Sequence, residues 1–300
     1  MTLIHNPSAG HEDHDREGLL AALSAAGHQV EYRSSIDGDW EQALAGRPEL
    51  VVVAGGDGTV NQVFKKLAGT PILVTLLPLG TANNIADTLG FASVEAEQLV
   101  GAWSSYVRRP YDLGEIAAPW GRKRFVEGAG GRLFGDLFAR AEDTEGEDAD
   151  DKVRYGLELL RDVLSSAEPS VWEVDLDGND LSAELLGVEA LNIREAGPEI
   201  RLAPAADPTD GLLEVVLIAP EDRDPLREHI EARLTGGIPR EFRRTAKRGR
   251  ELTFRASAAG LLHVDDEPWQ PGEERRHGSV VVRTGAEQVC VLAPEPGRRA

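Results

Sequence analysis

The stretch VVVAGGDGTV, residues 51–60, joins an apolar run directly to a loop with three glycines in four positions. Ordering glycine costs conformational entropy, so we infer that this loop has a use that requires them. Residues 59–68 then repeat apolar side chains at helical spacing, which predicts a strand, a glycine loop and a helix in succession. A backbone without side chains at a helix start can approach a phosphate group closely. The open alternative is a tight strand-to-helix turn that binds nothing.

Asp57, in the middle of the loop, narrows the choice of ligand. A carboxylate repels a bare phosphate, so Asp57 indicates a divalent cation between it and the phosphates of a nucleotide. The sequence contains no GxxxxGK[ST] P-loop, and Asn61 replaces the third glycine of the dinucleotide fingerprint GxGxxG. A second loop, residues 79–84, leaves the next apolar strand in the same way. Taken alone, this second loop is also consistent with a helix N-cap.

The composition describes a globular chain of 300 residues, of which 41% are hydrophobic and 28% charged. The formal net charge of −20 repels nucleic acid and anionic membranes, so contact with either requires a local basic patch. The single Cys290 excludes an intramolecular disulfide and points to a reducing compartment. We find neither a signal peptide nor an apolar run long enough to span a bilayer. We therefore expect a cytoplasmic protein that is at most peripheral to a membrane.

The first third of the chain alternates strand and helix signals. Strands are expected at residues 2–5, 29–34, 50–54 and 72–80, and all of them except 29–34 are apolar runs. Such strands favour a parallel sheet covered on both faces, in which ligands bind at the carboxyl ends of the strands.

From about Tyr106, short strands separated by turn residues predict a largely antiparallel second domain with one helix at 153–166. Seven of the ten positions 142–151 are acidic, which is typical of a solvated, mobile loop.

Three segments of the first third, HNPSAG (5–10), VVVAGGDGTVNQVF (51–64) and LPLGTANNIA (77–86), resemble the bacterial diacylglycerol/lipid kinase family. Two later segments, IRLAPAADPTDGLLEVVLI (200–218) and LHVDDEPW (262–269), extend the resemblance over nearly the whole chain. The GGDGT loop is shared with sphingosine kinases, NAD kinases and phosphofructokinases, whereas the GTAN and DPTDGLLEV segments are specific to the lipid-kinase branch.

The resemblance implies an α/β + β fold. An N-terminal three-layer α/β nucleotide-binding domain with a mostly parallel sheet is expected at residues 1–108. A C-terminal antiparallel β-sandwich domain of the NAD kinase/diacylglycerol kinase-like type, which receives the lipid, is expected at 109–287. Residues 288–300 are expected to return to the first domain, and the family's active site lies in the cleft between the domains.

The resemblance also implies transfer of the γ-phosphoryl group of MgATP to a lipid hydroxyl, with a diacylglycerol-like, phosphatidylglycerol or sphingoid acceptor. The residues carried over for the nucleotide are Asn6, Ser34, Gly55, Gly56, Asp57, Gly58, Thr59, Val60, Asn61, Gln62, Gly80, Thr81 and Asn83. A structural Mg²⁺ is implied at the side chain of Asp210 and the carbonyls of Asp207 and Leu212, and these oxygens suit that ion. A plain Asp-Gly hairpin is the alternative.

Glu267 is implied as the general base that accepts the hydroxyl proton, because the family's Asp-Gly-Glu segment falls on residues 265–267. Asp265 is expected to orient Glu267 or to assist the metal, and Asp57 to organise the nucleotide's metal as part of the catalytic set. An acidic turn before a proline is the alternative. The family usually has Gly at position 266 and Asp at position 84, whereas this chain has Asp266 and Asn84.

Two rival functions remain open. An NAD kinase or another small-molecule kinase shares the GGDGT loop, and the two departures motivate a nucleotide-binding regulatory protein without turnover. The predicted partner is a lipid at a membrane surface, bound peripherally and transiently, with no nucleic acid and with a homodimer left open. The basic segment 240–250 is the local candidate for attraction to such a surface, although a solvated charge run is the favoured interpretation of these residues.

Overall fold

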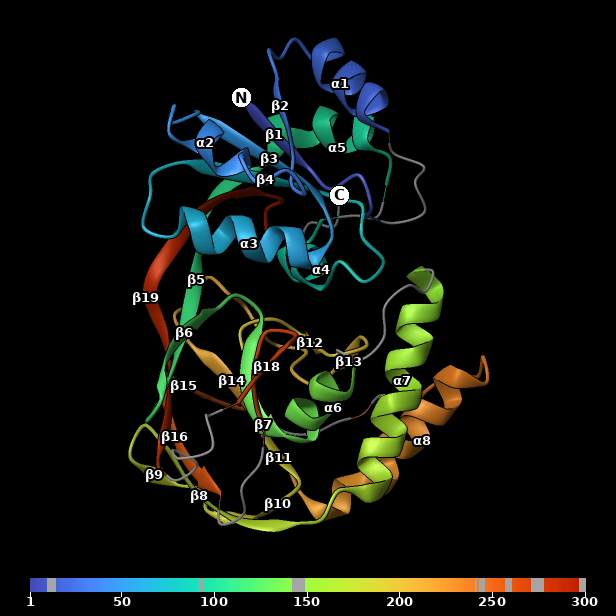
Figure 1. Cartoon of the computed structure of the whole chain (residues 1–300), viewed down its shortest axis with the longest axis vertical. Helices are drawn as coiled ribbons and strands as arrows, with labels where there is room; N and C mark the ends of the chain where they lie inside the picture. Colours follow the sequence, from blue (N-terminus) through green and yellow to red (C-terminus); the bar gives the residue numbers. More distant parts are fainter. Residues whose placement is uncertain are drawn as a thin grey trace. The chain divides into compact units, whose positions relative to one another are not determined.

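The computed structural model describes residues 1–9, 15–91, 94–141, 149–240, 242, 246–256, 261–270 and 278–296. The chain divides into two compact units, the first formed by Met1–Asp112 with Glu287–Ala300 and the second by Leu113–Ala286 (Figure 1). Strands β5 (Val107–Ala118) and β19 (Val280–Ala293) each contain residues of both units. Among the helices in these described ranges, none combines the length and the apolar character needed to cross a bilayer.

The first unit is built on a parallel sheet with the order β2-β1-β3-β4. Its strands are β1 (Thr2–His5), β2 (Glu31–Ser34), β3 (Leu50–Gly55) and β4 (Leu73–Pro78), and the end of β19 extends the sheet beside β4. β1 and β3 are nearly wholly buried, as expected for strands covered on both faces. Because β2 and β3 lie on opposite sides of β1, the chain reverses its direction across the sheet at this point. Such a switch point is where open α/β sheets bind ligands.

Helices cover both faces of this sheet. They are α1 (Arg16–Ala25), α2 (Trp40–Leu44), α3 (Asp57–Leu67), α4 (Asn84–Leu89) and α5 (Ala96–Ala102). Figure 1 shows α1 and α5 on one side of the strands and α3 and α4 on the other, which makes the unit three layers. α3 buries Val60, Val63, Phe64 and Leu67 at the spacing that its sequence predicts.

The second unit contains two antiparallel sheets. One has the order β15-β14-β11-β7-β17-β18, from β15 (Lys247–Gly249), β14 (Leu213–Ile218), β11 (Gly187–Leu191), β7 (Gly128–Arg132), β17 (Leu262–Val264) and β18 (Glu267–Trp269). The other contains β10 (Ala183–Leu185), β8 (Ser170–Leu176), β16 (Glu251–Ala256) and the start of β19. β6 (Gly121–Phe125) pairs with β5, β9 (Asn179–Asp180) pairs with β8, and β12 (Glu195–Ala196) pairs with β13 (Ile200–Arg201).

Alternating residues of the six-stranded sheet serve two separate cores. Val188 and Ala190 of β11 belong to a core shared with Trp172 and Phe254 of the other sheet. Leu191, on the opposite face of β11, belongs to a second core that is shared with three helices. These helices are α6 (Leu133–Ala141), α7 (Ala149–Ser166) and α8 (Arg223–Leu234). The period of two along the strands therefore separates a sandwich core from a helix-covered face.

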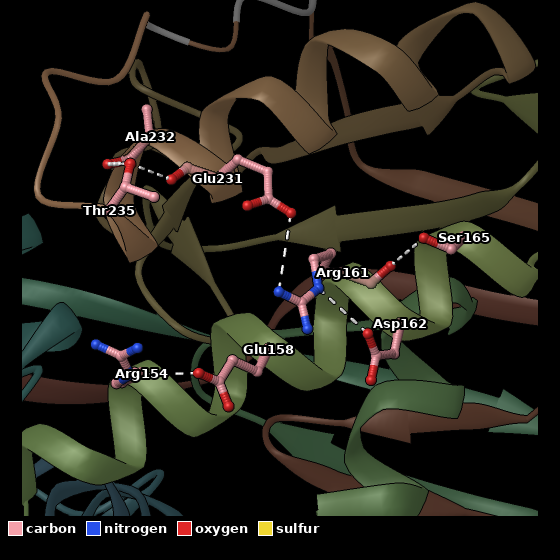
Figure 2. Close-up of polar contacts among 8 residues, drawn as sticks. All are labelled: Arg154, Glu158, Arg161, Asp162, Ser165, Glu231, Ala232 and Thr235. Carbon is pink, nitrogen blue, oxygen red and sulfur yellow. Dashed lines mark hydrogen bonds and ion pairs between the residues drawn. The ribbon is translucent and has the colours of Figure 1, made fainter.

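The described part of this unit contains three α-helices, whereas the sequence predicted one, at 153–166. That helix is present within α7, but the prediction of a single helix was wrong, because α6 and α8 were missed. α7 and α8 pack by their apolar sides, and Figure 2 shows the polar contacts around them. Arg161 of α7 forms an ion pair with Glu231 of α8 at 3.8 Å. Exposed pairs of this kind contribute only about 0–1 kcal/mol, so burial of leucine and isoleucine side chains determines how the helices pack.

The acidic tract at 142–151 is not wholly a loop. Residues 142–148 lie outside the described residues, but α7 already begins at Ala149. The last three positions of the tract therefore lie in the first turn of a helix.

Candidate functional site

The carboxyl ends of four parallel strands meet at one edge of the first unit's sheet, and the predicted nucleotide residues follow these ends. β1 is followed by Asn6, β2 ends at Ser34, and β3 and β4 lead into the two glycine loops. Asn6 Nδ2 donates to Thr59 Oγ1 at 3.3 Å, which joins the loops after β1 and β3 at the switch point. The structure thus gathers the residues of four separate sequence segments at one edge.

The glycines of the two loops differ in what they do. A Cβ on Gly55 would lie 2.8 Å from Thr59 Oγ1, and one on Gly80 would lie 2.4 Å from the Cα of Gly56. These three glycines are therefore required by the packing of the chain itself. A Cβ on Gly58 would meet no atom of the described residues within 4 Å. Gly58 is exposed in the first turn of α3, so its surroundings are open to a ligand.

Asp57 joins the two loops through hydrogen bonds. Its Oδ2 accepts from Asn84 N at 2.8 Å and its Oδ1 accepts from Ile85 N at 3.0 Å. The carboxylate at the start of α3 thus satisfies two amides at the start of α4, where helix N–H groups have no partner within the helix. The role of Asp57 in organising a metal stays a prediction, since these two contacts are both with protein.

The second loop is closed by Asn83, which has a left-handed φ of 54°. Gly80 N donates to Asn83 Oδ1 at 2.9 Å, and Asn83 Nδ2 donates back to the Gly80 carbonyl. Between them, Thr81 is exposed. The side chain of Asn83 is therefore engaged in forming the loop, while Thr81 faces outward.

Burial distinguishes the remaining predicted nucleotide-binding side chains that a ligand can reach from those that it cannot. Thr59, Val60 and Asn61 are buried, so a ligand would meet exposed Gln62 rather than these three side chains. Ser34 is also buried, and its Oγ has no hydrogen-bond partner within the described part of the chain. A buried hydroxyl without a partner is uncommon and calls for an explanation, such as a bound group.

The turn predicted to hold magnesium is contacted by a cationic side chain of the protein, Arg248 of β15. Asp210 Oδ1 accepts from Leu212 N at 2.9 Å, while Oδ2 forms an ion pair with Arg248. Arg248 Nε also lies 2.9 Å from Glu214 Oε1. Burial raises the pKa of Glu214, and the charge of Arg248 opposes that effect. The oxygens suit Mg²⁺ in chemistry, but an ion there would have to compete with Arg248 for Asp210, and the magnesium site stays a prediction.

Asp207 contributes to the same turn in another way. Its Oδ1 accepts from the backbone N of Thr209 at 3.0 Å and from the hydroxyl of Thr209 at 2.7 Å. Among the residues that the structure describes, no group of three or more His, Cys, Asp or Glu side chains is placed to hold a metal.

The acidic hairpin of the second unit separates the two carboxylates that were predicted to act together. Glu267 has a side chain that is 69% exposed and lies 3.5 Å from Lys123 Nζ. Asp265 is 5% exposed, and its Oδ1 accepts from the backbone N of Val126 and Glu127 at 2.9 and 2.8 Å. Glu267 can therefore meet a substrate, whereas Asp265 fastens the hairpin to the segment before β7.

A buried pair, Glu189 and His263, was missed by the sequence analysis. His263 Nε2 lies 2.7 Å from Glu189 Oε2. Burial raises the pKa of Glu189, an effect that His263 opposes. Burial alone would lower the pKa of His263, but the charge of Glu189 and the hydrogen bond to it outweigh burial, so this pKa is raised. The available signal was a glutamate inside the apolar run LLGVEALNI together with a histidine inside LLHV.

Two family models match the chain. Residues 1–116 match the diacylglycerol kinase catalytic domain, and residues 139–280 match the YegS C-terminal NAD kinase beta sandwich-like domain. Fold and site thus define a kinase of the two-domain diacylglycerol kinase/NAD kinase-like class, with its glycine loops on the parallel sheet.

The relatives narrow this class. The chain is 32% identical over 312 residues to the protein named "Probable lipid kinase YegS-like" of Pseudomonas savastanoi pv. phaseolicola (strain 1448A / Race 6), over 99% of this chain and 94% of that protein. It is 28% identical over 247 residues to the diacylglycerol kinase of Mycobacterium tuberculosis (strain ATCC 25618 / H37Rv), over 75% of each. The chain belongs to the YegS-like lipid kinase family.

Solved structures agree on the fold. A diacylglycerol kinase structure from Bacillus anthracis str. Sterne superposes with a TM-score of 0.67 at 20% identity, over 98% of this chain and 96% of that one. Yeast NADH kinase in complex with NADH superposes with a TM-score of 0.57 at 11% identity, over 99% and 84%. The family resemblance, the fold class and the assignment as a lipid kinase are confirmed.

Proposed function

We propose that the chain transfers the γ-phosphoryl group of MgATP to the hydroxyl of a diacylglycerol-like, phosphatidylglycerol or sphingoid lipid. Membership of the lipid kinase family supports the reaction class, and a relative named diacylglycerol kinase supports the acceptor. The observation that carries the proposal is the open edge of the parallel sheet, where Gly58 has no steric reason among the described residues to be glycine.

The first unit binds the nucleotide in this proposal. The start of α3 presents backbone N–H groups beside Gly58, and helix N-termini favour phosphate. The unpartnered hydroxyl of Ser34 at the end of β2 supplies a further donor. Bound MgATP supplies the phosphoryl group, and its magnesium offsets charge that develops on the phosphate oxygens.

The second unit provides the base. Glu267 Oε2 accepts the proton of the acceptor hydroxyl, which requires an accessible carboxylate such as the one observed. Lys123, 3.5 Å away, offsets the charge of Glu267 before the substrate binds. Asp265 orients Glu267 by fastening the turn two residues before it.

In this proposal the protein binds its lipid substrate at a membrane surface, peripherally and transiently. Nucleic acid is not a partner, and the proposal is compatible with a homodimer. The basic segment 240–250 is the proposed electrostatic contact. Arg248 within it is engaged by Asp210 and Glu214, so the attraction rests on the other basic residues of the segment.

The test is transfer of labelled γ-phosphate from MgATP to a panel of lipid hydroxyls in mixed micelles, with NAD⁺ as a parallel acceptor. Labelled lipid is expected from the wild type and is expected to fall at least a hundredfold in Glu267→Gln. Glu251→Gln is the matched control, because Glu251 also forms an exposed ion pair, with Arg283 at 2.6 Å. Labelled NADP⁺ would favour the NAD kinase alternative, and ATP binding without any labelled product would favour the regulatory alternative.

The nucleotide half of the proposal is tested by Gly58→Ala. An alanine inside a helix stabilises it by about 0.5–1 kcal/mol relative to glycine, and the added Cβ meets no described atom. We therefore expect Gly58→Ala to raise the melting temperature and to weaken ATP binding. Gly101→Ala in α5 is the control, since a Cβ there also meets nothing described within 4 Å. Unchanged ATP affinity in Gly58→Ala would contradict the placement of the nucleotide.

A further inference from the structure

Glu189, Gly130 and His263 form one row across three neighbouring strands of the second unit. Gly130 of β7 is in register with Glu189 of β11 on one side and with His263 of β17 on the other. Side chains in register on neighbouring antiparallel strands point to the same face. The adjacent residues Val188 and Val264 belong to the sandwich core, so this row lies on the helix-covered face. The rings of Phe134 and Phe138 of α6 lie beside His263 there.

The missing side chain of Gly130 lets the outer two residues meet across the central strand. A Cβ on Gly130 would lie 2.4 Å from Glu189 Oε2, the oxygen that His263 Nε2 contacts at 2.7 Å. Glu189 is 0% and His263 2% exposed, so water does not compete for this contact. A side chain in the middle of the row would therefore break the pair.

The other ring nitrogen of His263 determines where its proton lies. Nδ1 is 2.8 Å from the backbone carbonyl of Asp265. A carbonyl can only accept, so Nδ1 carries a hydrogen and donates it. A second proton lies between His263 Nε2 and Glu189 Oε2. Whether this proton is bound to the nitrogen or to the oxygen, the pair carries no net charge. Glu189 thus fixes the tautomer of His263 in which Nδ1 is a donor.

The hydrogen bond from His263 ends on the turn that precedes Glu267. Asp265 has a left-handed φ of 57°, a conformation that is unfavourable for most residues with a side chain and that its contacts stabilise here. Its backbone N donates to the Gly128 carbonyl at 2.7 Å, and its carboxylate binds the amides before β7. His263 supplies the remaining contact, to the carbonyl. Val264 and Glu267 then pair directly across the two-residue turn.

We propose that Glu189 and His263 are positioning residues for phosphoryl transfer, holding the Asp265 carbonyl and thereby the direction in which the hairpin presents Glu267. This inference rests on the proposed role of Glu267 as the base. Neither residue touches the substrate. Displacement of a catalytic group by about 1 Å can lower a rate a hundredfold, so the support of the turn matters to turnover.

Two substitutions of His263 separate its two contacts. His263→Asn retains a donor near the position of Nδ1 and loses the contact with Glu189, whereas His263→Gln reaches toward Glu189 and leaves the Asp265 carbonyl without its donor. We expect His263→Gln to lower kcat by about ten- to a hundredfold with an unchanged KM for ATP. We expect His263→Asn to retain most of kcat. The matched control is His229→Asn, because His229 Nδ1 also bonds a carbonyl, that of Arg240, at 2.8 Å.

A readout that does not depend on turnover comes from two tryptophans. The rings of Trp120 and Trp269 have centroids 5.6 Å apart, and Trp269 lies on β18 of the hairpin. Their coupled circular dichroism signal, identified by its loss in Trp269→Phe, is expected to change in His263→Gln and to persist in His263→Asn and His229→Asn. If the wild type phosphorylates no lipid, the proposed function fails, and this signal alone then decides whether the pair holds the hairpin.

Three results would overturn the inference. They are an unchanged kcat and signal in His263→Gln, an equal loss in His263→Asn, and an equal loss in His229→Asn. If His263→Gln does not fold, the comparison of Glu189→Gln with Glu189→Leu replaces it. A glutamine at 189 can donate to Nε2 and keep the proton on Nδ1, so its activity and signal are expected to remain, whereas leucine cannot. Equal behaviour of these two variants contradicts the inference.

Discussion

Gly56 and Gly80 touch backbone to backbone: a Cβ on Gly80 would lie 2.4 Å from the Cα of Gly56, and one on Gly56 would lie 3.1 Å from the Cα of Gly80. The loops after β3 and β4 are thereby joined at the edge of the sheet. Leu79 N donates to the Gly55 carbonyl at 3.1 Å and reinforces the junction. The spacing of the two loops therefore depends on the absence of two side chains.

Gly80→Ala is expected to lower the free energy of unfolding by about 1–3 kcal/mol, because the new Cβ meets a backbone atom that cannot turn aside. Gly56→Ala is expected to cost less, since its contact is longer. Urea denaturation of both variants, beside Gly58→Ala, checks this order. Equal stability of Gly80→Ala and Gly58→Ala would show that the loops can separate without cost.

Asp57→Asn is expected to destabilise the protein in the absence of nucleotide. Asn84 N and Ile85 N donate to different oxygens of Asp57, and in asparagine an NH2 group, which is a donor, replaces one of these oxygens, so one of the two hydrogen bonds is lost. Loss of one hydrogen bond to a charged group costs about 1.5–3 kcal/mol. Denaturation without ATP or metal measures this effect. If stability is unchanged and only magnesium-dependent ATP binding is lost, Asp57 acts on the metal as the sequence predicted.

The stability of the protein is expected to fall above about pH 6.5, the ordinary pKa of histidine. The pKa of His263 is raised in the folded protein, so the protonated ring stabilises the fold. This contribution to the free energy of unfolding is fully present below the pKa of the unfolded protein and is lost as the pH rises through the pKa of the folded protein. One additional bound proton gives a slope of at most about 1.4 kcal/mol per pH unit.

Urea denaturation from pH 6 to 9 measures this slope, with Glu189→Gln as the reference. Glutamine leaves His263 neutral with its proton on Nδ1, so the reference lacks this proton uptake. The difference between wild type and variant isolates the pair from the other titrating groups. If the free energies of unfolding of wild type and Glu189→Gln depend on pH in the same way, His263 has the same pKa in the folded and the unfolded protein, and the prediction is wrong.

Removal of metal by EDTA is expected to leave the melting temperature of the wild type unchanged, because Arg248 already balances Asp210 and Glu214. Arg248→Met removes that cation and is expected to make stability depend on Mg²⁺, since carboxylates then face one another without an opposite charge. Arg283→Met, which breaks an exposed pair with Glu251, is the control. A melting temperature of the wild type that falls in EDTA would support the predicted magnesium site.

Much of the first unit could be predicted from the sequence. Its strands β1, β3 and β4 are apolar runs, and its helices repeat apolar residues at helical spacing, as in α3. The site loops follow the strand ends, so parallel pairing alone brings Asn6, Ser34 and Gly58 to one edge. The sequence could not show that Asp57 binds the start of α4, because that contact joins residues 27 and 28 positions apart.

The second unit was harder to predict for a physical reason. α6 follows directly after the glycine-rich strand β7 and was not predicted as a helix, and α8 carries many charges beside its few buried residues Leu226, His229 and Ile230. The pair of Glu189 and His263 spans 74 positions and depends on strand order, which local patterns do not contain. The burial of Asp265 and the exposure of Glu267 likewise follow from the hairpin turn rather than from residue type.

The row Glu189–Gly130–His263 also constrains how this sequence can drift. A Cβ at position 130 would lie 2.3 Å from the Val188 carbonyl oxygen and 2.4 Å from Glu189 Oε2, so this position stays glycine whichever residues occupy 189 and 263. Positions 189 and 263 are coupled instead, because each of these buried side chains depends on the other for a hydrogen bond. Epistasis between positions 189 and 263 is therefore expected in any library of variants, and a scan of single substitutions would not reveal that these two positions form a pair.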